Sequence, residues 1–324
     1  IWHGPMADYR DYTRFSGRFI SEFGMQAVPD LATVETFTAP ADRYAESRVM
    51  DHHNKATDGP KRLGWYLTGN LRSTTDFEEY IYQTQWVQGE AVAAGVEGWR
   101  RRWSTPGNRL TAGALVWQIN DCWPVTSWAL VDSLLRPKAG YYRMKRALAP
   151  VNIGLACNPA TGKTEVWIAN NTLVPVTGEL EIQILTLSGD CVDTRTQTLT
   201  LAENTVTEIG AFSVASGELI SAGLITDGQV IARGVSWADL PKYASYPDPG
   251  LKLTWLDAGR VQLEVERPAR GVVLQTSAAV KLSDNMLDLM PGDPQIIEVE
   301  GLDGAEITVR GLGLTVSPSF IPVS

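Results

Sequence analysis

Cysteine and histidine are scarce in this sequence, which has three of each among its 324 residues. The cysteines Cys122, Cys157 and Cys191 lie far apart and are odd in number, so the sequence predicts no disulfide framework. Two of the histidines, His52 and His53, are adjacent, and adjacent side chains point in different directions on a helix or a strand. No cysteine lies near this pair and no H-x3-H spacing is present, so we expect neither a metal nor a cofactor.

Positive charge is also in the minority, with 28 basic against 37 acidic side chains and a net charge of −9. An acidic chain without a basic stripe is a poor candidate for binding nucleic acid or an anionic membrane. No apolar run approaches the roughly 18–20 residues of a membrane-spanning helix. The opening IWHGPMADYR has no charged leader followed by an apolar core, so we expect no signal peptide. A G-x-S-x-G motif and a glycine-rich phosphate loop are absent as well.

Residues 1–148 alternate between helix-like and strand-like segments. The spacing of the apolar residues predicts one long helix over 75–102, with Thr75 and Glu78 as a capping box and basic residues at its end. The runs RFISEF (18–23) and TAGALVWQIN (111–120) indicate strands that are buried on both faces, as in a parallel sheet. Buried strands separated by long helices indicate an α/β layer or barrel.

The pattern becomes all-β after about residue 150. Segments that alternate apolar and polar residues with period two end in turn residues, and Asp227-Gly228 predicts a hairpin. A proline-rich stretch at 239–250 separates two β blocks, each the size of a small antiparallel sandwich. Tryptophan is abundant, with eleven residues, but only Trp167, Trp237 and Trp255 fall in this β region, where we expect them in cores or interfaces.

A full (β/α)8 barrel needs roughly 200–250 residues, so residues 1–148 would supply only about two or three of its strands. Either this part is a smaller α/β fold, or the chain is the C-terminal part of a longer polypeptide.

Glu22 is the first candidate for chemistry. It follows the strand-like run RFIS and precedes Phe23-Gly24, and barrel enzymes place their catalytic groups at the carboxyl ends of strands. A glutamate on the surface, or one paired with Arg18, explains the same residue equally well.

Several segments, in order along the chain, resemble the β-mannosidases of the glycoside hydrolase family that also contains β-galactosidases and β-glucuronidases. SEFG and WQINDCWP are the specific motifs, and the β segments are weaker. The segments that carry the resemblance are IWHG (1–4), RFISEFGMQ (18–26), MDHHNKATDGPKRLGWYL (50–67), DFEEYIYQTQWVQ (76–88), GALVWQINDCWPVTSWALVD (113–132) and LSDNMLDLMPGDPQIIEVEG (282–301).

The resemblance implies a multidomain α/β plus all-β fold. Residues 1–148 would be the C-terminal portion of a (β/α)8 catalytic barrel. Residues 149–240 would be a mannosidase Ig-like β-sandwich, and residues 246–324 a C-terminal Ig-like β-sandwich.

The resemblance also assigns roles in the site. Glu22 would be the catalytic nucleophile of a retaining enzyme, which needs two carboxylates about 5–5.5 Å apart. The family's acid/base glutamate follows an asparagine, and no Asn-Glu pair precedes Glu22, so we expect the acid/base in the N-terminal remainder of the enzyme. Trp117 and Trp2 would shape the sugar subsite, and His3 would donate a hydrogen bond there. For Trp123 and Trp128 we favour core positions, and for Asn120 and Asp121 a structural role around Trp117.

The predicted function is an exo-β-mannosidase that removes terminal β-linked mannose from manno-oligosaccharides or glycans. Two alternatives stay open: the same fold with another sugar specificity (β-galactosidase, β-glucuronidase or exo-β-glucosaminidase), or a non-catalytic β-sandwich binding protein. The isolated chain is expected to be inactive and to expose unpaired strand edges. We expect a soluble protein, and the sequence leaves open whether the intact enzyme is cytoplasmic or secreted.

Overall fold

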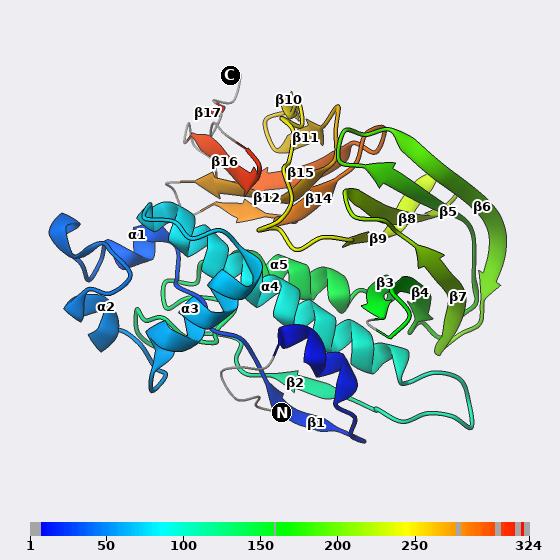
Figure 1. The fold of residues 1–324 in the computed structure, drawn as a ribbon, viewed down its shortest axis with the longest axis horizontal. Coiled ribbons are helices and arrows are strands. Elements are labelled where there is room, and N and C mark those ends of the chain that lie inside the picture. Colours follow the sequence, from blue (N-terminus) through cyan, green and yellow to red (C-terminus); the bar gives the residue numbers. More distant parts are fainter. Residues whose placement is uncertain (1–7, 159, 277–279, 302–305, 315–318, 321–324) are drawn as a thin grey trace.

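The computed structural model describes residues 8–158, 160–276, 280–301, 306–314 and 319–320. Within them the chain forms a mainly helical part followed by two β-sandwiches, and one long helix runs through the middle of the molecule (Figure 1). The helical part consists of η1 (Tyr9–Arg14), β1 (Ile20–Phe23), α1 (Leu31–Val34), η2 (Pro40–Asp42), α2 (Arg48–His52), α3 (Gly59–Asn70), α4 (Phe77–Arg101), β2 (Ala114–Val116) and α5 (Ala139–Ala147).

The predicted long helix is confirmed as α4, although its start is not at the predicted cap. Asp76 is the N-cap residue, and its carboxylate accepts a hydrogen bond from the backbone N–H of Glu79 at 2.7 Å. The predicted pairing of Thr75 with Glu78 is therefore wrong by one residue, because aspartate caps a helix as well as threonine does and stands one position later. Arg100 and Arg101 occupy the last turn as expected.

β1 and β2 pair in parallel, with Ile20 opposite Ala114 and Phe23 opposite Val116. Ile20 and Phe23 are buried in the core that α4 helps to form. The strands also have exposed residues: Ser21 and Glu22 of β1 are open to solvent, and Leu115 of β2 is 55% exposed. The expectation of strands buried on both faces is therefore wrong in this structure, since only one face of the two-stranded sheet is covered by helices.

The first sandwich consists of a three-stranded sheet, β3-β4-β7, and a four-stranded sheet, β6-β5-β8-β9. A core of aliphatic side chains drawn from both sheets lies between them. Asp227 and Gly228 form the β8–β9 turn with φ of 51° and 74°, so the predicted hairpin is confirmed. The strands are β3 (Val151–Asn158), β4 (Lys163–Asn170), β5 (Val176–Thr186), β6 (Cys191–Leu201), β7 (Thr205–Ser213), β8 (Glu218–Thr226) and β9 (Gln229–Trp237).

The second sandwich consists of two four-stranded sheets, β10-β11-β15-β13 and β14-β12-β16-β17, with an aliphatic core between them. Trp237, at the end of the first sandwich, donates its indole N–H to Asp288 of this second sandwich at 2.9 Å. The strands are β10 (Lys252–Asp257), β11 (Arg260–Glu264), β12 (Ala269–Thr276), β13 (Lys281–Leu282), β14 (Leu287–Leu289), β15 (Gln295–Glu300), β16 (Ile307–Leu312) and β17 (Ser319–Phe320).

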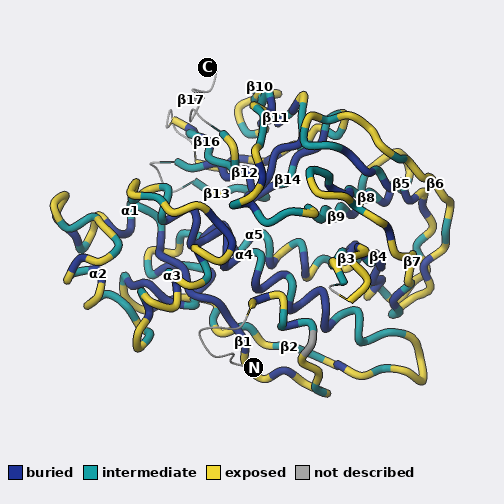
Figure 2. Tube along the Cα trace, in the orientation of Figure 1, coloured by how far each residue is buried: buried dark blue, intermediate teal, exposed yellow. Residues whose placement is uncertain are grey.

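α4 contacts both sandwiches as well as the rest of the helical part (Figure 1). Most of its residues between Ile81 and Trp99 are buried (Figure 2). Arg101 at its C-terminal end pairs with Glu165 of β4 and Glu208 of β7, both at 2.6 Å. Tyr82, near its N-terminal end, donates its hydroxyl to the carbonyl oxygen of Gly271 in β12 at 2.9 Å. The helix is thus fixed at both ends by different sandwiches. The exact limits of the three predicted domains remain predictions.

Candidate active site

Glu22 and Trp117 come from the carboxyl ends of the two neighbouring parallel strands. Glu22 is the third residue of β1 and is exposed, and Trp117 directly follows β2 and is 44% exposed. The backbone N–H of Trp117 donates to the carbonyl oxygen of Phe23 at 2.7 Å, so the two strand ends are hydrogen-bonded together. The structure therefore brings these two predicted residues to one edge of the sheet. Trp2 and His3, the other two, lie outside the described residues.

Aromatic rings pack against the buried side of β1, next to Glu22. Phe23 is fully buried and meets Trp99 of α4 edge-on, with ring centroids 4.6 Å apart. Tyr12 of η1 meets Phe23 in the same way at 5.8 Å and donates its hydroxyl to the carbonyl oxygen of Gly24 at 2.7 Å. Because Phe23 alternates with Glu22 along the strand, burying its ring directs the glutamate side chain to the opposite, open face.

Gly24 allows the strand ends to approach each other. A Cβ at this position would lie 2.1 Å from the carbonyl oxygen of Trp117, far inside van der Waals contact. Gly24, two residues after the glutamate, is therefore needed for close backbone packing.

The loop that follows Glu22 is held by polar side chains of α4. Gln88 is fully buried, and its amide N–H group lies within hydrogen-bond distance of the carbonyl oxygens of Met25, Trp128 and Ala129, at 2.9, 3.2 and 3.2 Å. It therefore contacts the loop after β1 and the loop after β2 at once. One turn earlier, Gln85 donates to the carbonyl oxygen of Val28 and accepts from the backbone N–H of Ala139.

Asp121 organises the loop after Trp117, which confirms the structural role expected for it. Its side chain is buried, and one oxygen accepts from Lys55 Nζ at 2.7 Å and from the Gln118 amide at 3.3 Å. The other oxygen accepts from the Ser127 hydroxyl at 2.5 Å. Asn120, in contrast, is exposed, and its amide donates to the carbonyl oxygen of Asp121 at 3.3 Å.

Lys138 is the most unusual charged residue near the site, because it is fully buried. Its Nζ donates to the carbonyl oxygen of Ala27 at 3.0 Å. Burial lowers the pKa of Lys138 to about 8, and the neighbouring carboxylates Asp121, Asp132 and Asp30 partly oppose that shift. Burial also raises the pKa of Asp30 above its usual range.

Trp123 lies in a cluster of rings rather than in the core, which corrects the prediction for this residue. It is 36% exposed, and its ring centroid lies 4.8 Å from that of His53, which stacks on Phe37 at 4.0 Å. The Nδ1 of His53 is 2.6 Å from the carbonyl oxygen of Pro124. His53 thus fixes the loop around Trp123. No group of residues with metal-ligand geometry occurs in the described part of the chain.

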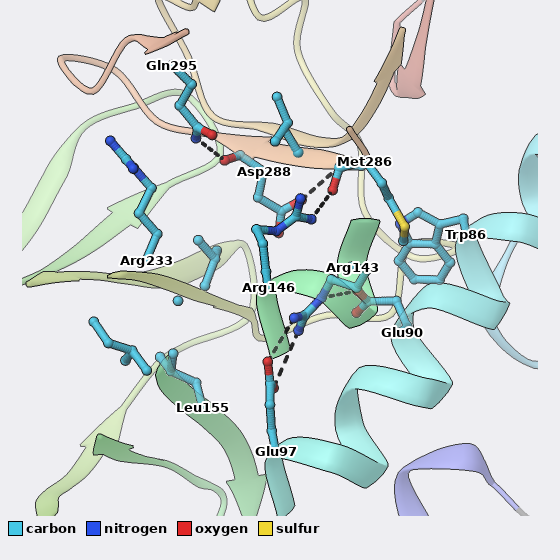
Figure 3. Close-up of a pocket in the computed structure, with 15 residues that line it drawn as sticks. Trp86, Glu90, Glu97, Arg143, Arg146, Leu155, Arg233, Met286, Asp288 and Gln295 are labelled. Atoms are coloured by element: carbon cyan, nitrogen blue, oxygen red, sulfur yellow. Dashed lines mark hydrogen bonds and ion pairs between the residues drawn. The ribbon is translucent and has the colours of Figure 1, made fainter. Parts of the chain in front are cut away.

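A cavity of about 70 Å³ lies elsewhere, where α4 and α5 meet both sandwiches (Figure 3). Charged side chains line it, and they are already paired. Arg143 bonds Glu97 at 2.8 Å and lies 3.4 Å from Glu90, while Arg233 bonds Asp293 at 2.6 Å. A space of this size holds only a few water molecules. Neither Glu22 nor Trp117 lines it, so we assign this cavity to the packing of the three parts and not to the site.

Three buried polar residues hold the site loops and were not predicted from the sequence: Gln85, Gln88 and Lys138. The signal for the two glutamines was present, because they interrupt the apolar face of a long predicted helix. Lys138 gave no comparable signal, since lysine after proline is ordinary on a surface. Within the described part of the chain, none of the helices has the length and apolar character needed to cross a bilayer.

Two family models match the β region: residues 162–243 match a Mannosidase Ig/CBM-like domain, and residues 246–314 match an Ig-fold domain. Both sandwiches are thus confirmed as Ig-like.

Curated relatives match nearly the whole chain. β-Mannosidase B of Emericella nidulans is 36% identical over 333 residues, covering 96% of this chain and 39% of that protein. β-Mannosidase B of Aspergillus niger is 37% identical over 331 residues, covering 94% and 39%. The chain thus spans well under half the length of these relatives.

Solved structures give the same picture. The β-D-mannosidase from Dictyoglomus thermophilum superposes with a TM-score of 0.86 at 28% identity, over 96% of this chain and 39% of that one. The exo-chitosanase CsxA from Amycolatopsis orientalis has a TM-score of 0.80 at 18% identity, over 98% and 45%, and shares the fold. The chain is therefore similar, over 96% of its own length, to a part of the β-mannosidases that makes up 39% of their length.

Proposed function

We propose that the enzyme containing this chain is a retaining exo-β-mannosidase, and that this chain supplies its nucleophile, Glu22. One observation carries the proposal. An exposed glutamate and an exposed tryptophan lie at the carboxyl ends of two neighbouring parallel strands, in a chain whose relatives are β-mannosidases. In this proposal the indole of Trp117 stacks on the apolar face of the mannose ring, a contact that aromatic rings favour.

We further propose that β1 and β2 are two strands of a (β/α)8 barrel whose other strands lie in the part of the enzyme beyond this chain. Two features support this. The strands are parallel and adjacent, and helices cover one face while the other is open to solvent. The chain also covers only 39% of relatives that match it over 96% of its own length. The open face would then be the barrel interior.

The proposed reaction has two steps. The Glu22 carboxylate attacks the anomeric carbon of the terminal mannose and forms an ester bond, while the glycosidic C–O bond breaks. A second carboxylic acid, from the remainder of the enzyme, gives its proton to the departing oxygen. That group then accepts a proton from water, whose oxygen attacks the anomeric carbon, releasing mannose and restoring the Glu22 carboxylate.

Covalent trapping tests the proposal directly. A 2-deoxy-2-fluoro-β-mannosyl fluoride slows the second step more than the first, so it should leave the sugar attached to the nucleophile. We expect the label on the peptide that contains Glu22, and no label on a Glu22→Gln enzyme. A label on another side chain would exclude Glu22 from this role. A panel of nitrophenyl β-glycosides then identifies the sugar, and preference for a galactoside, glucuronide or glucosaminide would refute mannose specificity.

A further inference from the structure

Lys138 lies where the two loops that leave β1 and β2 meet. Its Nζ donates to the carbonyl oxygen of Ala27, in the loop after Glu22, at 3.0 Å. Its backbone N–H donates to the carbonyl oxygen of Leu130, in the loop after Trp117, at 2.9 Å. We propose that Lys138 is a positioning residue for the reaction: its ammonium group fixes the two loops against each other and so sets the placement of Glu22 relative to Trp117. This inference rests on the proposed function.

The same two loops are already paired through their backbones. Ala27 and Ser127 exchange hydrogen bonds at 2.9 and 3.3 Å, and the hydroxyl of Ser127 donates to Asp121 at 2.5 Å. Among the described residues, Lys138 is the only charged group that donates a hydrogen bond to the carbonyl oxygen of Ala27. If Lys138 moved, both strand ends would therefore shift, because each loop begins one or two residues after Glu22 or Trp117.

Four charged groups act electrostatically on the ammonium: Asp121, Asp132 and Asp30 raise the pKa of Lys138, and Lys55 lowers it. Asp121 belongs to the loop after Trp117 and is paired with Lys55 at 2.7 Å. Asp132 is buried and accepts from the hydroxyl of Thr33 at 2.5 Å, and Asp30 precedes α1. The positive charge on Lys138 offsets the repulsion between the three carboxylates, and in a buried setting that repulsion is strong. Arg136 offsets part of the charge of Asp30.

The proton on Lys138 leaves at mildly alkaline pH, because burial places its pKa at about 8. Above this pH, Asp121, Asp132 and Asp30 lose a balancing charge while the fold stays intact. We expect the loops to shift apart and turnover to fall. If Lys138 only stabilised the fold, loss of its proton would leave kcat/KM unchanged.

The test uses the full-length enzyme and 2,4-dinitrophenyl β-mannoside. This leaving group departs without a proton, so the acid/base residue imposes no alkaline limit on kcat/KM, which reports the first step only. Over about pH 6 to 10 we expect kcat/KM to fall with an apparent pKa near 8.

Variants assign that pKa. Lys138→Met keeps about the length of the side chain and removes the charge. We expect kcat to fall about 10- to 100-fold with a smaller change in KM. We also expect the alkaline limb of the profile, the fall of kcat/KM near pH 8, to disappear. Lys55→Met removes a neighbouring positive charge, which favours the ammonium form of Lys138 and moves the limb to higher pH. The control is Lys61→Met, whose side chain is 84% exposed and which should leave the profile unchanged.

Two results would overturn the inference: a wild-type profile that stays flat to pH 10, or a limb that Lys138→Met leaves in place. If Lys138→Met does not fold, the wild-type profile and the Lys55→Met shift still decide. Glu22→Gln separates the two proposals. Turnover by Glu22→Gln would refute the proposed function. If Glu22→Gln is inactive but Lys138→Met keeps the fall of kcat/KM near pH 8, only the role of Lys138 is refuted.

Discussion

Trp117 donates its backbone N–H to the carbonyl oxygen of Phe23 at 2.7 Å, directly beside the proposed nucleophile. This hydrogen bond is one step of the parallel ladder, and it continues the pairing of Phe23 with Val116. The sheet backbone therefore holds side by side the two strand ends that carry the proposed nucleophile and the tryptophan proposed to stack on the sugar. Substitutions that disturb this ladder should affect both residues together.

Gly24→Ala should destabilise the site region by about 1–3 kcal/mol, the usual cost of forcing an extra methyl group into close packing. The added Cβ would lie 2.1 Å from the carbonyl oxygen of Trp117, a backbone atom that cannot move aside alone. The measurement is urea denaturation of purified protein. Gly64→Ala in α3 is the control, because a Cβ there meets nothing within 4 Å and alanine favours a helix. Equal effects of the two substitutions would contradict the packing argument.

Trp117→Ala should lower kcat/KM of the full-length enzyme about 100-fold or more and leave its stability nearly unchanged. The indole is 44% exposed, so little burial is lost, whereas a stacked sugar loses its platform. Trp65→Ala is a matched control, since Trp65 is 45% exposed and lies on α3. Comparable losses of activity in the two variants would show that Trp117 does not contact the sugar.

Lys138 should make stability depend on pH in a window that its lowered pKa defines. In the unfolded chain the amine holds its proton to about pH 10.5, and in the folded chain to about 8. Between these values the unfolded state binds more protons, so folding becomes more favourable as pH rises, by up to about 1.4 kcal/mol per pH unit. Below pH 8 the cost of burying the charge is constant.

Lys138→Met removes this dependence. The unfolding free energy of the wild type minus that of the variant should therefore increase from pH 8 to pH 10, as measured by urea denaturation at fixed ionic strength. Other groups, including tyrosines with raised pKa values, are common to both proteins and cancel in the difference. Parallel pH profiles of the two proteins would show that Lys138 does not titrate in this window.

Arg143→Met should weaken the attachment of α5 to α4 by about 2 kcal/mol, because it leaves Glu97 buried without its partner. The carboxylate of Glu97 is only 8% exposed and bonds Arg143 at 2.8 Å (Figure 3). Arg195→Met is the control, since that pair lies on an exposed strand and the arginine side chain is 65% exposed. Such a surface pair contributes about 0–1 kcal/mol. A cost for Arg143→Met no greater than that for Arg195→Met would contradict the assignment.

The open face of the two-stranded sheet should make the isolated chain self-associate. Phe19 and Leu115 are more than half exposed there, and edges of unpaired strands attract other chains. Replacing both with lysine should reduce association in sedimentation velocity. Leu173→Lys tests a leucine that is 86% exposed but lies far along the chain, and it should have little effect. We also expect the isolated chain to be inactive on β-mannosides, because in our proposal the acid/base residue lies in the remainder of the enzyme.

The local patterns predicted most elements of the fold correctly. Period-two alternation identified the β region, Asp227-Gly228 marked its hairpin, and apolar spacing marked α4. Burial was predicted less well. RFISEF and TAGALVWQIN have the composition of strands buried on both faces, yet Leu115 is open to solvent. The order of apolar residues along a strand indicates which side chains tend to be buried, but it does not indicate whether another segment covers them.

The sequence by itself determined which side chains are available at each strand end: Glu22 two residues before Gly24, and Trp117 after a short apolar run. Tertiary structure alone decided how those ends are held. Gln88 and Lys138 lie more than 40 residues from one another in the chain, yet both hold the same pair of loops. A polar side chain in a sequence can face either water or a buried carbonyl group, and only the packing of distant segments removes the water and leaves the carbonyl as its partner.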